Sequence, residues 1–270
     1  MAEVMNILDE IVAHKRQEVA EKKELFPTKL LEQSLFFGGR PVSLKKYLQR
    51  EDKVGIIAEI KRRSPSKGAI NQHVSVERTS IGYMQAGASG LSILTDKKYF
   101  GGKNEDLQTA RKYNFCPILR KDFIVEEYQI VEAKSIGTDV ILLIAACLSA
   151  EELKQLSAFA HSLDLEVLLE VHNEEELKKS VDAAPDMIGV NNRDLQTFDT
   201  TVQTSIDLAA KIPGDVVKVS ESGISDPKVV AELMGHGYEG FLIGEYFMKH
   251  GQPSKACSSF IKQVKLLTGK

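Results

Sequence analysis

The stretch IIAEIK, residues 56–61, is an apolar run that ends in a carboxylate and an ammonium group. Later runs end in the same abrupt way, on a charged side chain, an amide or a glycine: PILRK (117–121), VLLE (167–170), IGVNNR (188–193), VVKVSESG (216–223) and FLIGE (241–245). An apolar run without polar alternation is typical of a strand buried on both faces, as in a parallel sheet covered by helices. Because parallel strands end at one edge, the charged groups should converge there, and we predict an active site at that edge.

These runs belong to a strand–helix repeat that continues from about residue 51 to residue 270. Candidate strands start near residues 55, 90, 117, 139, 166, 187, 216 and 240, and amphipathic helices are expected between them, for example at 151–163, 174–183 and 227–236. A capping box from Ser149 to Glu152 marks one helix start. Glycines mark expected helix ends at residues 87, 137 and 237. The pattern predicts an α/β fold, a single (β/α)8 TIM barrel over residues 51–270.

Residues 1–50 have a helical period instead, and we expect them to form an N-terminal helical extension of the barrel. Val4, Leu8, Ile11 and Val12 fall on one helical face, and Pro27 is an expected break. The extension could cap the barrel or cover the site. A doubly wound sheet is the alternative fold, but KRRSPSKG (61–68) follows the first strand, where that fold usually has GxGxxG. The segment does not match a nucleotide P-loop either.

Composition narrows the class of protein. The formal net charge of -3 over 270 residues gives no broad field for nucleic acid or membrane, and we expect neither as a partner. Cys116, Cys147 and Cys257 have no disulfide or metal-site spacing, so neither a disulfide framework nor a zinc site is expected, and a reducing compartment fits best. The N-terminus lacks a signal-peptide core, and a cytoplasmic location is expected. The sequence does not fix the oligomeric state, for which we expect a monomer or a weak homo-oligomer.

Groups at the carboxyl ends of barrel strands point into the mouth, which gives a set of candidate site residues: Glu59, Lys61, Lys121, Glu170, Asn191, Arg193, Glu221 and Ser222. Taken singly, each could be a solvated rim charge, and Lys61 lies in a basic cluster. Arg120 should face the other way and could pair with a helix carboxylate. Glu170 is the strongest single candidate, because an unpaired carboxylate on an apolar strand would be costly.

Two glycine turns add a second signal. SESGI and IGEYF place Gly223 and Gly244 where the last two strands lead into helices, and barrels commonly bind phosphate there through backbone N–H groups. Either glycine could equally serve a tight turn alone. Together with the basic groups they favour a small phosphorylated molecule as substrate.

Seven segments resemble indole-3-glycerol phosphate synthases: AEIKRRSPSKGAI, ILTDKKYFGG, PILRKDFI, LLEVH, IGVNNRDLQTF, VSESGI and FLIGE. The resemblance implies a (β/α)8 barrel with an extra N-terminal helical segment. It also implies the conversion of 1-(2-carboxyphenylamino)-1-deoxyribulose 5-phosphate to indole-3-glycerol phosphate in tryptophan biosynthesis. Carbon dioxide and water are released, and no cofactor takes part.

The resemblance also implies roles. Lys121 matches the family's catalytic lysine, the acid for ring closure, and Glu59 matches its orienting partner. Lys61 matches a second lysine, which is assigned to binding of substrate anions and to proton donation in the dehydration. Glu170 matches the base, and Asn191 belongs with this catalytic set. Further matches are substrate contacts at Ser64, Phe100, Phe123, Arg193, Glu221 and Ser222, and a phosphate cradle at Lys61, Gly223, Gly244 and Glu245.

Two rival functions stay open on the residues alone. One is another phosphate-binding barrel of the same pathway, such as the isomerase that uses a Cys and an Asp. AEIK stands where that cysteine would be, which argues against it. The other is a non-catalytic barrel that senses a phosphorylated metabolite, which would have no need for Lys121 or Glu170.

Overall fold

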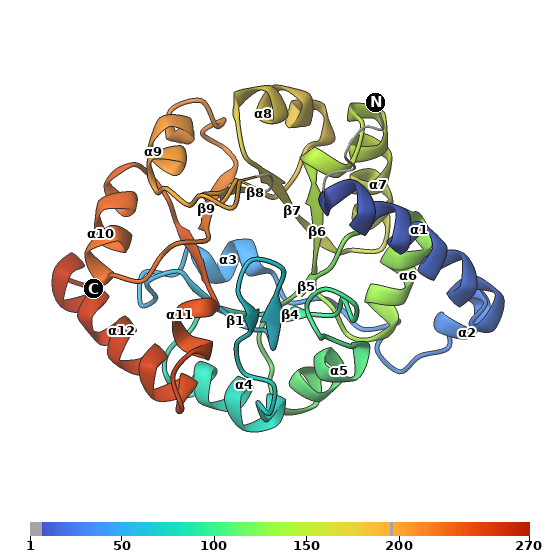
Figure 1. The fold of residues 1–270 in the computed structure, drawn as a ribbon, viewed down its shortest axis with the longest axis horizontal. Coiled ribbons are helices and arrows are strands. Elements are labelled where there is room, and N and C mark those ends of the chain that lie inside the picture. Colours follow the sequence, from blue (N-terminus) through green and yellow to red (C-terminus); the bar gives the residue numbers. More distant parts are fainter. Residues whose placement is uncertain (1–6, 195–196) are drawn as a thin grey trace.

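Eight parallel strands close into a barrel in the computed structural model, which describes residues 7–194 and 197–270. Neighbouring strands pair in the order β1, β10, β9, β8, β7, β6, β5, β4, and β4 pairs with β1 to complete the circle (Figure 1). The barrel strands are β1 Ile56–Ile60, β4 Gly90–Leu94, β5 Ile118–Lys121, β6 Val140–Ile144, β7 Glu166–Val171, β8 Met187–Asn191, β9 Val217–Glu221 and β10 Gly240–Ile243. The predicted barrel is confirmed.

Helices surround the barrel, as Figure 1 shows from one end. They are α4 Val76–Gln85, α5 Asn104–Tyr113, α6 Glu127–Ser135, α7 Ala150–Ser162, α8 Glu174–Ser180, α9 Gln203–Ala209, α10 Pro227–Gly235, α11 Glu245–Met248 and α12 Pro253–Thr268. The predicted capping box at Ser149 is present, and Gly87, Gly137 and Gly237 have positive φ beyond helix ends. A hairpin of β2 (Arg63–Ser64) and β3 (Gly68–Ala69) follows β1 and lies near the mouth.

Alternation along each strand separates two cores. Side chains such as Leu119, Leu142 and Leu168 fill the barrel, while Leu143 and Leu169 belong to the larger core between strands and helices. Because alternate residues point to opposite faces, the charged residue that ends a strand points inward or outward by register alone.

The opposite end of the barrel is closed by α3 (Leu44–Leu48). Leu44 and Leu48 pack into the interior core, and Glu166, the first residue of β7, accepts hydrogen bonds from the backbone N–H groups of Leu44 and Lys45 and from the Ser43 hydroxyl. A carboxylate at a helix start satisfies N–H groups that have no partner within the helix. Among the described residues, α3 thus covers this end of the interior core, while a cavity lies at the strand ends that carry the predicted site.

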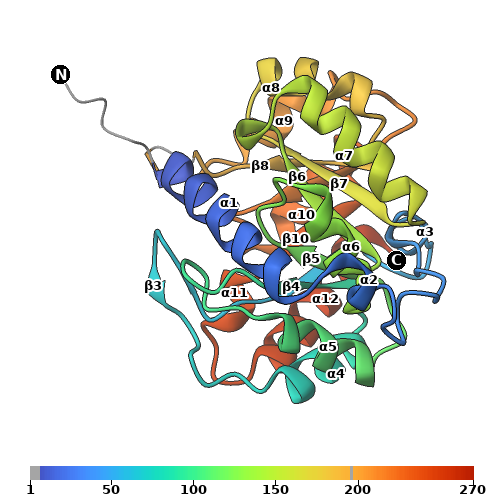
Figure 2. The same cartoon turned by 90° about the vertical axis from the view of Figure 1, so that its right-hand side faces the viewer.

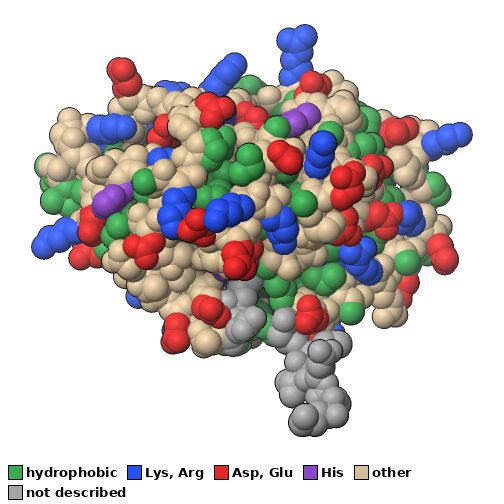
Figure 3. Space-filling view, turned by 90° about the horizontal axis from the view of Figure 1, so that it is seen from above, with side chains coloured by type: hydrophobic (Ala, Val, Ile, Leu, Met, Phe, Trp, Pro, Cys, Tyr) green, Lys and Arg blue, Asp and Glu red, His purple; other side chains and the backbone are tan. Residues whose placement is uncertain are grey.

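The N-terminal segment is less helical than expected. It forms α1 (Ile7–Leu25), a short α2 (Thr28–Leu31) after Pro27, irregular turns, and then α3. Figure 2 shows α1 crossing the outside of the barrel at the mouth end. Ile11 and Val19 are buried as an apolar face requires, whereas Val4 lies outside the described residues. No helix in the described ranges has the length and apolar character to cross a membrane. Figure 3 shows basic and acidic side chains interspersed on one face.

A buried lysine fixes α1 to the barrel. Lys15 is 1% exposed, and its Nζ lies 3.0 Å from Asp96 Oδ2 and 3.0 Å from Asp122 Oδ1. Both aspartates are buried and lie in the loops that follow β4 and β5. Burial opposes the charge of Lys15, but Asp122 and Asp96 together hold its pKa above the ordinary value. One cation thus joins α1 to the loops that continue from two barrel strands.

Replacing Lys15 by methionine should leave the buried Asp96 without its cation and Asp122 with Arg120 alone. We expect Lys15→Met to lower the free energy of unfolding by about 3–5 kcal/mol. Lys23→Met is the control, since Lys23 lies on the same helix and pairs with Glu126 at the exposed surface. It should change stability by no more than about 0.5 kcal/mol. Urea unfolding followed by circular dichroism measures both, and equal losses would contradict the role given to Lys15.

Candidate active site

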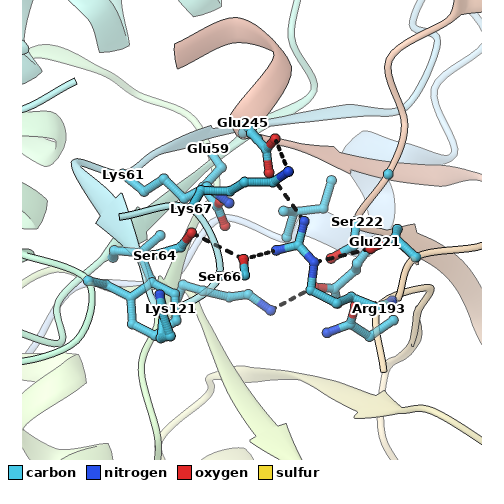
Figure 4. Close-up of a pocket in the computed structure, with 18 of the residues that line it drawn as sticks. Glu59, Lys61, Ser64, Ser66, Lys67, Lys121, Arg193, Glu221, Ser222 and Glu245 are labelled. Carbon is cyan, nitrogen blue, oxygen red and sulfur yellow. Dashed lines mark hydrogen bonds and ion pairs between the residues drawn. The ribbon is translucent and has the colours of Figure 1, made fainter. Parts of the chain in front are cut away.

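One cavity of about 440 Å³ opens at the carboxyl ends of the barrel strands. Every site residue predicted from the sequence lines it: Glu59, Lys61, Ser64, Phe100, Lys121, Phe123, Glu170, Asn191, Arg193, Glu221, Ser222, Gly223, Gly244 and Glu245. Figure 4 shows the labelled charged side chains, among them Lys121, Arg193 and Glu245, gathered around the cavity from different strand ends. The expected convergence at one edge of the sheet is confirmed.

Lys121 lies at the centre of the site, between two buried carboxylates. Its Nζ donates to Glu170 Oε2 at 2.7 Å and to Glu221 Oε2 at 2.6 Å. Lys121 ends β5, Glu170 is in β7 and Glu221 ends β9, so barrel closure brings the three together. Asn191, at the end of β8, donates from Nδ2 to Glu170 Oε1 at 2.9 Å. The second oxygen of Glu221 is buried and has no hydrogen-bond partner among the described residues.

The electrostatics of this cluster follow from one cation shared by two acids. Burial opposes the charge of Lys121, but Glu170 and Glu221 hold its pKa above the ordinary value. Burial also opposes ionisation of Glu170, and Lys121 and His172 outweigh it, so the Glu170 pKa is lowered. Burial and the neighbouring Glu170 raise the pKa of Glu221. The site thus holds a charged lysine beside an ionised carboxylate, which is the arrangement that an acid and a base in one reaction require.

Glu59 and Lys61 form a second pair at the end of β1. Glu59 Oε1 lies 2.8 Å from Lys61 Nζ. The direct ionic partner of Glu59 is therefore Lys61. The sequence interpretation made Glu59 the orienting partner of Lys121. In the structure, Glu170 and Glu221 accept the hydrogen bonds of Lys121 instead. Glu59 still raises the pKa of Lys121 through its charge. A Cβ at Gly244 would lie 2.3 Å from Glu59 Oε1, so this glycine makes room for the carboxylate.

Arg193 joins three loops across the mouth. Its guanidinium donates to Ser66 Oγ at 3.1 Å, in the loop after β1, and to Glu245 Oε2 at 3.2 Å, after β10 (Figure 4). Lys67 Nζ lies 4.0 Å from the same carboxylate, and Ser64 Oγ lies 3.4 Å from Ser66 Oγ. The Glu245 carboxylate would repel a phosphate, so its contribution to a phosphate cradle would have to come from the backbone N–H group.

An apolar wall completes the cavity on the other side. The rings of Phe100 and Phe123 lie 6.1 Å apart between centroids, and Leu8 and Ile11 of α1 line the same space. Part of the N-terminal segment therefore contributes to the site. On the polar side, Ser222 and Gly223 both have positive φ (68° and 74°), which turns the chain after β9 sharply at the cavity.

Comparisons with known proteins agree with this geometry. Residues 8–260 match the family model of indole-3-glycerol phosphate synthase. The chain belongs to the indole-3-glycerol phosphate synthase family. It is 50% identical to a protein of that name from Bacteroides thetaiotaomicron over 96% of this chain and 99% of the relative. A second relative of that name, from Aliarcobacter butzleri, is 42% identical over 90% of this chain and 94% of the relative.

Solved structures of low sequence identity support the fold alone. A chain described as a native KDPGal structure superposes with a TM-score of 0.59 at 14% identity, covering 82% of this chain and all of that one. No cluster of three or more histidine, cysteine or acidic side chains suited to a metal ion occurs within residues 7–194 and 197–270.

Sequence reasoning missed some residues that shape the site of this family member. Gly189 makes room for Glu221, since a Cβ there would lie 2.3 Å from Glu221 Oε1. The sequence feature that could have identified Gly189 is a glycine inside an apolar strand, which often marks a close approach of another group. His172 lies two residues after Glu170 and 3.5 Å from it, on the same side of the extended chain. The burial of Lys15 could not be predicted from the sequence, because Lys15 lies in a helix with many other charged residues.

The contact between Gly244 and Glu59 can be tested directly. Gly244→Ala should push the Glu59 carboxylate aside and disturb its pair with Lys61. We expect kcat/KM for the reaction of this family to fall at least about tenfold, since small displacements of catalytic groups are costly. Gly235→Ala is the control, because a Cβ at Gly235 meets nothing within 4 Å. A Gly244→Ala enzyme as active as Gly235→Ala would show that this space is not needed.

Proposed function

We propose that this chain is a decarboxylating lyase that makes indole-3-glycerol phosphate from 1-(2-carboxyphenylamino)-1-deoxyribulose 5-phosphate. The observation that carries the proposal is the Lys121 ammonium held at hydrogen-bond distance from Glu170 and Glu221 in the barrel mouth. A phosphate sensor would need a cradle but no buried acid–base cluster. Membership of the family supports the same activity.

The cavity has a place for each part of such a substrate. We propose that the backbone N–H groups at Gly223 and Gly244, with Lys61, bind the phosphate. The aromatic ring lies against Phe100 and Phe123, and the carboxylate lies near Arg193. Ser64, Ser222 and Glu221 contact the remaining polar groups. Leu8 and Ile11 cover the ring from α1, which makes residues 1–50 an extension that completes the site of residues 51–270.

Ring closure needs a proton at the ribulose carbonyl oxygen as the aromatic carbon attacks. Lys121 supplies it in this proposal, and the ammonium also stabilises charge that develops on that oxygen in a site shielded from water. The carboxylate then leaves as carbon dioxide, and its bonding electrons restore the aromatic ring. Asn191 orients the Glu170 carboxylate through a 2.9 Å hydrogen bond from its Nδ2 to Oε1.

Dehydration follows on the ring that has formed. Lys61 protonates the departing hydroxyl group, and Glu170 removes the proton from the adjacent ring carbon. Two protons thus leave the lysines and one reaches Glu170, so each turnover takes up one proton from solvent when the substrate carboxylate is ionised. No step calls for a metal or an organic cofactor. We propose a cytoplasmic enzyme that acts as a monomer or a weak homo-oligomer.

Single-turnover kinetics with mass detection test these roles, with EDTA present throughout. The parent should convert the substrate to indole-3-glycerol phosphate. Lys121→Met should hold unreacted substrate, with a rate lower by about 10²–10⁴, since the acid for the first step is lost. Glu170→Gln keeps the shape but removes the base, and should accumulate a cyclised species that has not lost water.

Both variants should fold, and circular dichroism checks this. The proposed function fails if the parent makes no product. The assigned roles fail if both variants turn over near the parent rate. Activity that EDTA abolishes and a divalent ion restores would mean that the chemistry has been misread.

A further inference from the structure

Asn192 follows Asn191 at the end of β8, and the two amides point to opposite faces of the barrel wall. Of the two, only Asn191 is among the described residues that line the cavity, whereas Asn192 is 2% exposed and lies behind it. Alternate residues of an extended chain point to opposite faces, which accounts for the difference. The reaction proposed above gives Asn192 no role, so a buried amide at this position needs another explanation.

The side chain of Asn192 makes all four hydrogen bonds that an amide can make. Its Nδ2 donates to Ser220 Oγ at 3.0 Å and to the backbone carbonyl oxygen of Ser222 at 3.1 Å. Its Oδ1 accepts from the backbone N–H of Ser205 at 3.2 Å and from the Ser205 hydroxyl at 2.8 Å. The opposite orientation of the amide would set its NH2 group against the Ser205 N–H, so these bonds fix which atom faces Ser222.

Three side chains thereby close a ring of hydrogen bonds between β8, β9 and α9. Ser205 Oγ lies 2.7 Å from Ser220 Oγ, and both serines are buried. Because the Ser205 hydroxyl donates to Asn192, the Ser220 hydroxyl donates to Ser205, and the Asn192 NH2 group donates to Ser220. The Tyr238 hydroxyl donates to the carbonyl oxygen of Ser205 at 2.7 Å and anchors the start of α9. A buried network with every member satisfied is rigid, and it aims the remaining N–H of Asn192 at Ser222.

The carbonyl group that Asn192 holds belongs to the turn at the proposed phosphate site. Ser222 has a φ of 68° and Gly223 a φ of 74°, and a residue other than glycine enters this left-handed region only at a cost. Gly223 also packs against Thr200, since a Cβ at Gly223 would lie 2.5 Å from Thr200 Cγ2. The Thr201 backbone N–H donates to the carbonyl oxygen of Asn192 at 3.0 Å. Asn192 therefore contacts the turn directly and also holds the segment that packs against it.

We propose that Asn192 is a positioning residue for phosphate binding, which holds the turn at Ser222 and Gly223 so that the Gly223 N–H faces the phosphate group. The inference rests on the phosphate site proposed above. Asn192 acts through the backbone and does not touch the substrate. Because the phosphate group takes no part in bond making or breaking, a displaced turn should weaken substrate binding much more than it slows the chemical step.

Asn192→Asp tests the inference, because aspartate has the shape of asparagine but cannot donate to Ser222. The Ser220 hydroxyl can turn to donate to the new oxygen, so the Ser222 carbonyl is the partner that is lost. We expect KM for the substrate and Kd for inorganic phosphate to rise at least about tenfold, while kcat stays within about threefold of the parent. Steady-state kinetics and phosphorus-31 NMR titration with inorganic phosphate measure these constants.

Asn114→Asp is the matched control for the new charge. Asn114 is also buried, and its Nδ2 donates to a serine hydroxyl, Ser80 Oγ, at 3.0 Å and to a backbone carbonyl, that of Ala110, at 2.8 Å. These residues are not in the described lining of the cavity. Asn114→Asp should bind inorganic phosphate as the parent does, although its loss of stability should be comparable to that of Asn192→Asp.

Ser205→Ala is a second variant that adds no charge. It removes the hydroxyl that holds Asn192 Oδ1 but keeps the backbone N–H, so Kd for inorganic phosphate should rise about threefold. Ser80→Ala is its control and should leave that Kd unchanged. If Asn192→Asp does not fold, Ser205→Ala decides the question.

The inference is overturned if Asn192→Asp and Ser205→Ala bind inorganic phosphate as tightly as the parent. It is also overturned if Asn114→Asp weakens binding equally, because the loss would then come from general destabilisation. A parent that binds inorganic phosphate but forms no product would count against the proposed function instead.

Discussion

The charge of Lys121, shared between two buried carboxylates, is the interaction on which the rest of the site depends. Two carboxylates close together in a dry interior repel each other and are costly to ionise. The ammonium offsets both effects and gives each acid a hydrogen-bond donor. Because the three groups belong to β5, β7 and β9, only a closed barrel brings them within bonding distance.

Small residues and supporting contacts make this cluster possible. Gly189 and Gly244 leave space for the carboxylates of Glu221 and Glu59, where a Cβ would clash. On the outer face of β5, Arg120 pairs with Asp122 and with Glu132 of α6, as the sequence suggested it could. Asp122 in turn contacts Lys15, so the loop after Lys121 is held to α1 by a buried ionic network. The N-terminal helix and the catalytic strand are therefore positioned by the same set of charges.

The barrel and the members of the site could be predicted because local sequence patterns indicate both. Apolar runs with a polar residue at the end define each strand and its mouth, and the spacing between runs defines the number of repeats. Pairings could not be predicted in the same way. Whether Glu59 binds Lys61 or Lys121 depends on side-chain geometry after closure, and Lys15 looks like any solvated helix charge until two loops cover it. The turns between α2 and α3 escaped prediction because contacts with the barrel, rather than helical period, determine them.

The most direct test of the shared charge is a carbon-13 NMR titration of the carboxyl groups of Glu170 and Glu221, in the parent and in Lys121→Met. In the parent, Glu170 should titrate below and Glu221 above the ordinary range for glutamate, as one coupled pair. Removal of the ammonium should move both titrations to higher pH, because a nearby cation favours the ionised form. Titrations that do not change in Lys121→Met would contradict the central place given to this lysine.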